Sequence, residues 1–99
     1  MTERIYTTET GERVRERGRH IEVGLSPEAQ AALGDLLHFQ PPKLGQLARE
    51  GEHLFFVEGT LTAAEFYAPV SGRVVRYAIA DASISDWMVV INRDTTPAE

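Results

Sequence analysis

The chain has 99 residues, of which 42% are hydrophobic and 25% charged, with a formal net charge of −5 and no cysteine. This length predicts a single domain, because hydrophobic cores seldom divide below roughly 250 residues, and the negative charge argues against a nucleic-acid binder. Without cysteines, a signal peptide or an apolar run near the ~20 residues of a membrane span, we expect a cytoplasmic protein with neither disulfides nor a membrane anchor.

Alternating side chains predict a β-hairpin over residues 12–24. Three arginines at alternate positions share one face, Val14 lies on the other, and Gly18 separates the two strands. The four arginines of residues 12–22 are offset by three glutamates, which leaves a charge of only +1. We therefore interpret this segment as the solvated face of a hairpin and not as a nucleic-acid site.

A short helix is predicted directly after this hairpin. Ser26 can cap free backbone N–H groups, Pro27 suits the first helical position, and Glu28 favours the positive end of the helix dipole. Gly34 is a suitable C-terminal cap. The helix would be too short to survive alone, so it must pack against strands.

Short strands separated by glycine and proline turns are predicted for the rest of the chain. They cover residues 36–40, 46–49, 53–58, 65–68, 73–79 and 87–92. The apolar run at residues 54–57 favours a strand that is buried on both faces. This pattern, with a polar tail at residues 94–99, predicts a mainly β sandwich or barrel with one short helix.

The most specific motif lies at residues 57–72. Its sequence, V-E-G-T-L-T-A-A-E-F-Y-A-P-V-S-G, resembles the modification hairpin V-E-S-V-K-A-A-S-D-L-Y-S-P-V-S-G of the glycine cleavage system H protein family. Other segments resemble family motifs in the family's order: residues 23–36, 42–45, 49–52 and 72–75, and Trp87. The resemblance implies a lipoyl-domain-like β-sandwich, or barrel-sandwich hybrid, in one domain over residues 1–99 with its core at about 12–94.

In that family the lysine of the hairpin carries lipoic acid in amide linkage. An ungapped comparison places Leu61 at this position, and leucine has no amine to acylate. The family's long loop ahead of Trp87 is also shortened here, to residues 81–86. The resemblance therefore implies an H-type frame without its reactive atom, so we predict no bound cofactor.

The predicted function is a non-lipoylated interaction or regulatory module that docks on enzymes recognising H proteins or lipoyl domains. Glu58, Leu61 and Glu65 are the predicted partner contacts, although solvation of an exposed turn explains the two acids equally well. Leu61 is also expected to form a small apolar patch with Phe66 or Tyr67.

An alternative keeps the carrier function. A genuine aminomethyl or lipoyl carrier would need modification at Lys43, which is the chain's only lysine, or an arm supplied by another chain. The hydroxyls of Thr60 and Thr62 are poor substitutes, because an ester hydrolyses more readily than an amide. Gly59, which replaces a family serine, is expected to loosen the start of the turn.

Other residues predict no catalytic or metal site. The three histidines are 18 and 15 residues apart, unlike the i, i+4 pair of a helical metal site. Ser71 lacks the flanking glycines of a nucleophile elbow, so we interpret it as a turn serine. We therefore predict that the chain is not an enzyme.

Overall fold

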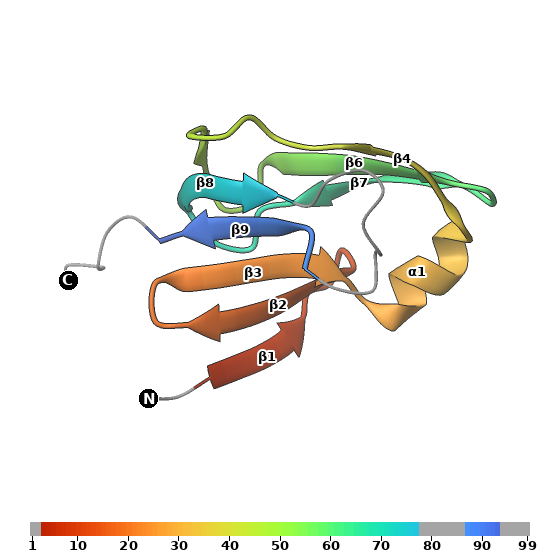
Figure 1. The fold of residues 1–99 in the computed structure, drawn as a ribbon. Helices are drawn as coiled ribbons and strands as arrows, with labels where there is room; N and C mark the ends of the chain where they lie inside the picture. Colours follow the sequence, from red (N-terminus) through yellow and green to blue (C-terminus); the bar gives the residue numbers. More distant parts are fainter. Residues whose placement is uncertain (1–2, 78–86, 94–99) are drawn as a thin grey trace.

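Two antiparallel sheets pack face to face in the computed structural model, which describes residues 3–77 and 87–93 (Figure 1). The strands are β1 (Glu3–Thr7), β2 (Glu12–Arg17), β3 (His20–Leu25), β4 (Leu36–Gln40), β5 (Leu47–Ala48), β6 (His53–Gly59), β7 (Ala63–Tyr67), β8 (Gly72–Tyr77) and β9 (Val89–Asn92). One sheet has the order β1-β2-β3-β9-β8-β5 and the other β4-β6-β7. The helix α1 (Pro27–Leu33) lies at one end of the sheets, which confirms a mainly β fold with one short helix.

The predicted hairpin and helix are both confirmed. Gly18 turns the chain with a φ of +61°, a left-handed conformation that favours glycine, and β2 pairs with β3 in antiparallel register. The Ser26 hydroxyl accepts a hydrogen bond of 3.1 Å from the backbone N–H of Ala29, as expected of an N-cap. Helix α1 buries only Leu33, so its stability depends on its contacts with the strands.

Aromatic side chains from the three-stranded sheet fill much of the core. Phe55 stacks on Phe66 with ring centroids 5.3 Å apart and meets Phe39 edge-on at 5.6 Å. The pairing of β6 with β7 shifts between His53 and Phe55, so consecutive residues turn inward there. This shift explains the apolar run, and the expected burial on both faces is wrong because Phe56 is only half-buried.

Strand β1 was not expected from the sequence. It pairs with β2 along its whole length, and the hydroxyl of Tyr6 donates a hydrogen bond of 2.8 Å to Glu16. Burial, together with this hydrogen bond, raises the pKa of Tyr6 to about 12. Most β1 side chains are exposed, so tertiary pairing and not an apolar pattern defines the strand.

The strands expected after the helix are present, whereas two expected segments lie outside the described residues. The expected strands beyond the helix correspond to β4 to β9, with ends displaced by a few residues. The shortened loop at residues 81–86 and the polar tail at 94–99 lie outside the described residues. None of the helices in the described part of the chain is long and apolar enough to cross a membrane.

Candidate functional site: the hairpin tip and its surroundings

The tip of the β6–β7 hairpin is bonded to the C-terminal end of α1. The backbone N–H of Leu61 donates to the carbonyl of Leu33 over 2.9 Å. Thr60 and Asp35 make a reciprocal pair, in which Thr60 N–H donates to the Asp35 carbonyl at 2.9 Å and Asp35 N–H donates to the Thr60 hydroxyl at 3.1 Å. Three hydrogen bonds from outside the hairpin therefore fix the main chain of its tip.

Two glycines allow the helix to approach this closely. A Cβ added at Gly59 would lie 2.7 Å from the carbonyl carbon of Leu33 and closer still to its oxygen. Gly34 ends the helix with a φ of +81°, and a Cβ there would lie 2.9 Å from Cγ of Leu61. The expectation that Gly59 loosens the turn is wrong in this chain, since Gly59 permits the contact that fixes it.

The structure brings the three predicted contact residues to one end of the molecule. Leu61 is 71% exposed at the tip. Glu58 and Glu65 are exposed on adjacent strands, and the pairing register places them on the same outward face, diagonal to one another. Diagonal neighbours in an antiparallel pair lie about 7–8 Å apart, so the two residues are neighbours on the outer face of the hairpin without being directly opposite one another.

The expected apolar patch of Leu61 with Phe66 or Tyr67 is wrong. Phe66 is only 2% exposed and belongs to the core, because alternation along β7 turns it to the face opposite Glu65. Tyr67 ends the strand at the far end from the tip. Another exposed leucine, Leu37, lies at the irregularity of the β4–β6 pairing, between Leu36, which pairs with Gly59, and His38, which pairs with Glu58.

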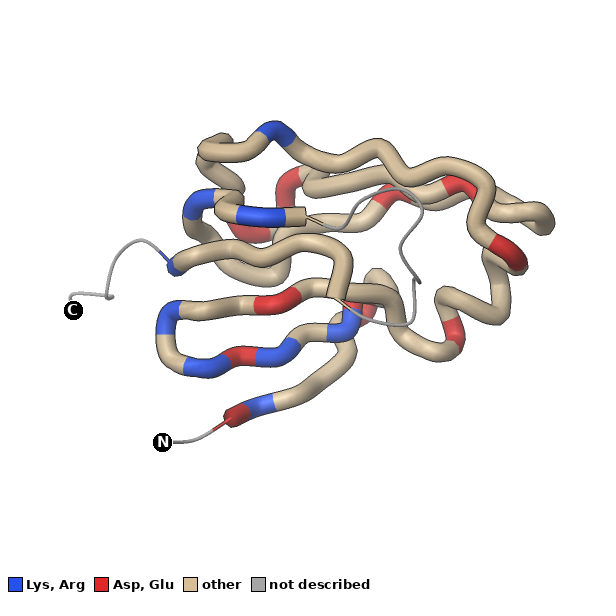
Figure 2. The backbone as a smooth tube through the Cα atoms, viewed as in Figure 1, with Lys and Arg blue, Asp and Glu red and all other residues tan. Residues whose placement is uncertain are grey.

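Charge is distributed unevenly along the molecule. No lysine or arginine occurs in residues 20–42 or 50–72, which include α1 and the β6–β7 hairpin. Figure 2 shows the corresponding end, on the right, with acidic and no basic positions. We call this surface the acidic end and define it by five residues, Glu28, Asp35, Glu58, Leu61 and Glu65.

A pocket of about 610 Å³ lies between the β1–β2 turn and β7, and sequence reasoning did not identify it. Its lining residues are Thr8, Glu9, Thr10, Glu12, Glu50, Gly51, Tyr67, Ala68 and Pro69. Three of them are glutamates, of which Glu9 and Glu50 are exposed and Glu12 is buried. Glu12 was predicted only as part of the hairpin, because nothing in its alternating pattern distinguishes it.

Glu12 is 1% exposed, yet both of its carboxylate oxygens have partners. The hydroxyls of Thr8 and Thr10 donate to one oxygen, and the backbone N–H of Tyr67 donates to the other over 2.7 Å. A buried carboxylate with three donors is stabilised in place. Glu12 therefore ties the β1–β2 turn to β7 and shapes the pocket wall.

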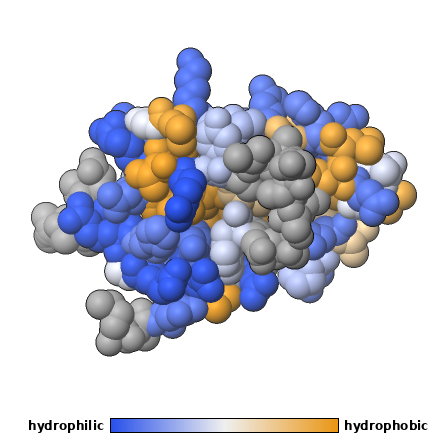
Figure 3. Space-filling view, viewed as in Figure 1, coloured by the Kyte–Doolittle hydropathy of each residue, from blue (hydrophilic) through white to orange (hydrophobic). Residues whose placement is uncertain are grey.

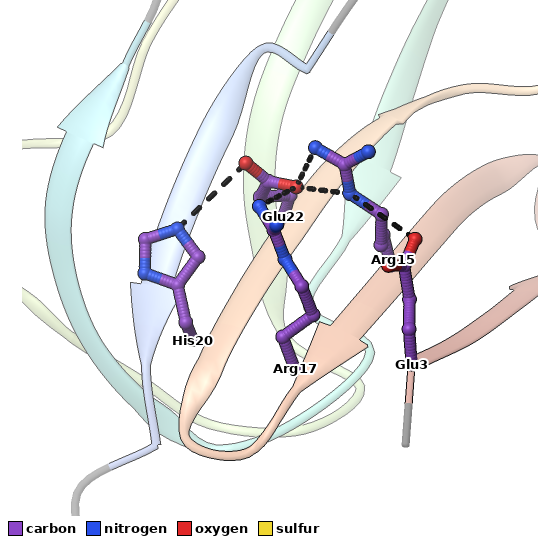
Figure 4. A network of polar contacts seen from close by, with 5 residues as sticks. All are labelled: Glu3, Arg15, Arg17, His20 and Glu22. Atoms are coloured by element: carbon purple, nitrogen blue, oxygen red, sulfur yellow. Dashed lines mark hydrogen bonds and ion pairs between the residues drawn. The ribbon is translucent and has the colours of Figure 1, made fainter. Parts of the chain in front are cut away.

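The arginine face of the β2–β3 hairpin forms a network of ion pairs (Figure 4). The Glu22 carboxylate contacts Arg15, lies 3.4 Å from the Arg17 guanidinium and 3.7 Å from Nε2 of His20. Arg15 also lies 3.9 Å from Glu3. These carboxylates offset the positive charge that the sequence pattern concentrates on β2.

The remaining candidate residues do not assemble into a second site. Lys43 is exposed in the loop before β5, and His38 is exposed on β4 beside Glu58. The Ser71 hydroxyl accepts a hydrogen bond of 2.9 Å from the N–H of Glu50, as expected of a turn serine. Within residues 3–77 and 87–93, no group of three or more histidine, aspartate or glutamate side chains could hold a metal ion.

The two packed sheets, with a hairpin that projects beside a single helix, define the lipoyl-domain-like barrel-sandwich class. The chain matches the family model for the glycine cleavage H-protein over residues 4–97, and it belongs to that family. The crystal structure of a glycine cleavage system H protein from Mycobacterium marinum superposes with a TM-score of 0.75 at 26% identity, covering 89% of this chain and 82% of that one.

Relatives in sequence have the same family name. The glycine cleavage system H protein of Stenotrophomonas maltophilia is 39% identical over 82 residues, or 83% of this chain. That of Thermus thermophilus is 37% identical over 78 residues, or 79% of this chain. In each case the matched region spans 60% of the relative's own length.

Proposed function

We propose that this chain is a non-lipoylated H-type module that acts by docking on a protein partner through its acidic end, without catalysing a reaction. The observation that carries the proposal is Leu61, which is 71% exposed at the hairpin tip. The resemblance of residues 57–72 to the family hairpin implies that Leu61 takes the position of the lipoyl lysine, and a leucine side chain cannot form an amide with lipoic acid. An exposed apolar side chain at a fixed tip supports a contact role in place of a carrier role.

The geometry of the tip favours binding. Because three hydrogen bonds already hold its main chain, docking costs little loop ordering. The exposed Leu61 fits an apolar pocket on a partner, while Glu58 and Glu65 suit cations at the rim of that pocket. Enzymes that recognise H proteins or lipoyl domains are the proposed partners.

Capture by such an enzyme tests the docking role. Purified enzyme that recognises the family hairpin, such as a lipoate ligase, is titrated with the wild-type chain and with Leu61→Asp. We expect Leu61→Asp to bind at least about tenfold more weakly, because it places a charge in an apolar contact. Ile5→Asp is the matched control, since Ile5 is exposed on β1 outside the acidic end. Equal binding by all three proteins would contradict the docking role.

The second candidate function is a carrier modified at Lys43. It is favoured by one observation, the exposure of this single lysine. Intact mass after co-expression with a lipoate ligase separates the two functions. We expect an unmodified wild-type mass, whereas a gain of one lipoyl group that disappears in Lys43→Arg would establish the carrier.

Restoring the amine tests whether the hairpin frame is intact. We expect Leu61→Lys to gain one lipoyl group under the same co-expression, because the three hydrogen bonds to the tip fix its main chain and leave the side chain of residue 61 exposed. Ile5→Lys presents an equally new lysine on another surface and should stay unmodified. Failure of Leu61→Lys to be modified would mean that the hairpin no longer presents its tip as the family does.

A further inference from the structure

Basic and apolar side chains come together around β5 and β8, away from the acidic end (Figure 2). Six exposed residues around β5 and β8 form what we call the basic corner: Lys43, Leu44, Leu47, Arg73, Val75 and Arg76. Its three apolar side chains, Leu44, Leu47 and Val75, are 60%, 48% and 47% exposed. Figure 3 shows hydrophobic residues gathered at the upper left, where β8 lies, with hydrophilic residues around them.

Backbone hydrogen bonds hold the basic corner in shape. The N–H of Val74 donates to the Gln46 carbonyl at 2.9 Å, and the N–H of Gly45 donates to the Val74 carbonyl at 2.7 Å. The guanidinium of Arg73 donates to the Gly45 carbonyl at 2.9 Å. The segment from Lys43 to the start of β5 therefore runs beside β8. Its exposed leucines, Leu44 and Leu47, lie next to the exposed residues of that strand.

An irregularity in β8 exposes two adjacent side chains. The register of β8 against β9 shifts between Val74 and Arg76, so Val75 and Arg76 both face outward. The side chains of Val75 and Arg76 are thus both presented on the outside of β8. On the neighbouring strand β5, Leu47 pairs with Arg73 of β8. The result is an apolar surface with three cations around it, in a chain whose net charge is −5.

We propose that the basic corner of one copy binds the acidic end of a second copy, so that the chain self-associates head to tail. Leu61 of the second copy would lie against the apolar side chains of the corner, and Glu58 and Glu65 would face its cations. The chain as a whole is negative, so unlike charges at the two ends favour this contact over contacts between like ends. Such a contact joins two different surfaces, so it leads to rings or open chains and not to a twofold dimer.

Self-association would cover Leu61, which is the residue that the docking function needs exposed. Assembly and docking would then compete for the acidic end, and the protein concentration would set how much of the chain is available. The head-to-tail contact itself does not depend on the docking function, because it involves only copies of this chain. The two proposals can therefore fail separately.

Sedimentation velocity of the purified full chain tests the contact. We expect the mean mass to rise with protein concentration and the rise to weaken at high ionic strength, since exposed charges are screened. Two variants reverse one end each: Lys43→Glu with Arg76→Glu at the basic corner, and Glu58→Arg with Glu65→Arg at the acidic end. Each variant alone should associate at least about tenfold more weakly than the wild type.

Mixing the two variants gives the decisive measurement. The intact acidic end of one variant matches the intact basic corner of the other, so an equimolar mixture should associate again. This recovery also shows that both variants are folded, and Leu47→Asp provides an independent, single-residue loss of association at the corner. A wild type that stays monomeric at every concentration, a mixture that stays monomeric, or a salt-insensitive dimer would each overturn the proposal. Binding of an acidic, leucine-containing peptide by a strictly monomeric chain would also overturn it.

Discussion

Replacing Gly59 with alanine tests the contact between α1 and the hairpin tip. The new Cβ would lie 2.7 Å from the carbonyl carbon of Leu33, whereas carbon atoms are in favourable contact at about 3.5–4.0 Å. The obstacle is backbone and not a flexible side chain, so the helix end and the hairpin must separate. This movement would break the hydrogen bond from Leu61 to Leu33 and strain the Thr60–Asp35 pair.

The cost follows from the contacts that are lost. Overpacking in a tight interior typically costs about 1–3 kcal/mol, and a lost backbone hydrogen bond adds about 1 kcal/mol. We therefore expect Gly59→Ala to lower the free energy of unfolding by about 3 kcal/mol. For a domain of this size, the corresponding decrease in Tm is about 15 °C.

Thermal and urea unfolding measure this decrease, with Gly18→Ala as the matched control. Gly18 has a φ of +61° and open space where a Cβ would be placed, so alanine there adds backbone strain of about 1 kcal/mol without a clash. Gly59→Ala should also reduce lipoylation of Leu61→Lys when the two are combined, because the tip loses its fixed position. Equal stability losses at the two glycines would refute the close approach.

Two further substitutions test polar contacts of β1 and of the pocket. Burial raises the pKa of Tyr6 from its ordinary value of 10.0 to about 12, so the stability that this shift contributes is complete below pH 10 and is lost as the pH rises toward 12. We therefore expect Tyr6→Phe to lose less stability than the wild type between pH 10 and pH 12, measured by urea unfolding. Equal losses in the two proteins would mean that the pKa of Tyr6 is unshifted. Glu12→Ala should cost about 2–3 kcal/mol, because it leaves three donors without an acceptor, whereas Glu12→Gln should cost under about 1 kcal/mol, since its amide can donate to the threonine hydroxyls and still accept from Tyr67. Similar losses for the two Glu12 variants would mean that the carboxylate does not tie the turn to β7.

Local sequence was sufficient where a single residue type determines the backbone. Ser26, Pro27 and Gly34 predicted both ends of α1, and Gly18 predicted the turn between β2 and β3, because capping and left-handed turns depend on one or two adjacent residues. The register of the β6–β7 hairpin was not predicted in this way. The apolar run of β6 predicted burial on both faces, and only the pairing with β7 places Glu58 and Glu65 on the outer face.

What the sequence could not predict depends on contacts between distant residues. Strand β1 has no fully buried side chain, so only its pairing with β2 distinguishes it from a loop. The role of Gly59 depends on Leu33, which is in a different element, and a glycine in isolation predicts freedom instead of close packing. Glu12 lies next to Tyr67 only after folding, so neither its burial nor the pocket could be inferred from the hairpin pattern.

The contact of residue 61 with the end of α1 does not depend on its side chain. Its hydrogen bond to Leu33 uses only the main chain, and its side chain is 71% exposed, so leucine contributes little to folding at this position. In a complex, burying that side chain would stabilise the bound state by about 1–2 kcal/mol, or roughly tenfold in affinity. Leu61→Ala should therefore leave the free energy of unfolding unchanged within about 0.5 kcal/mol and weaken capture by a docking enzyme about tenfold. If Leu61→Ala instead lost stability and kept its affinity, the leucine would serve the packing of the tip against Gly34, and the docking role would have no apolar anchor.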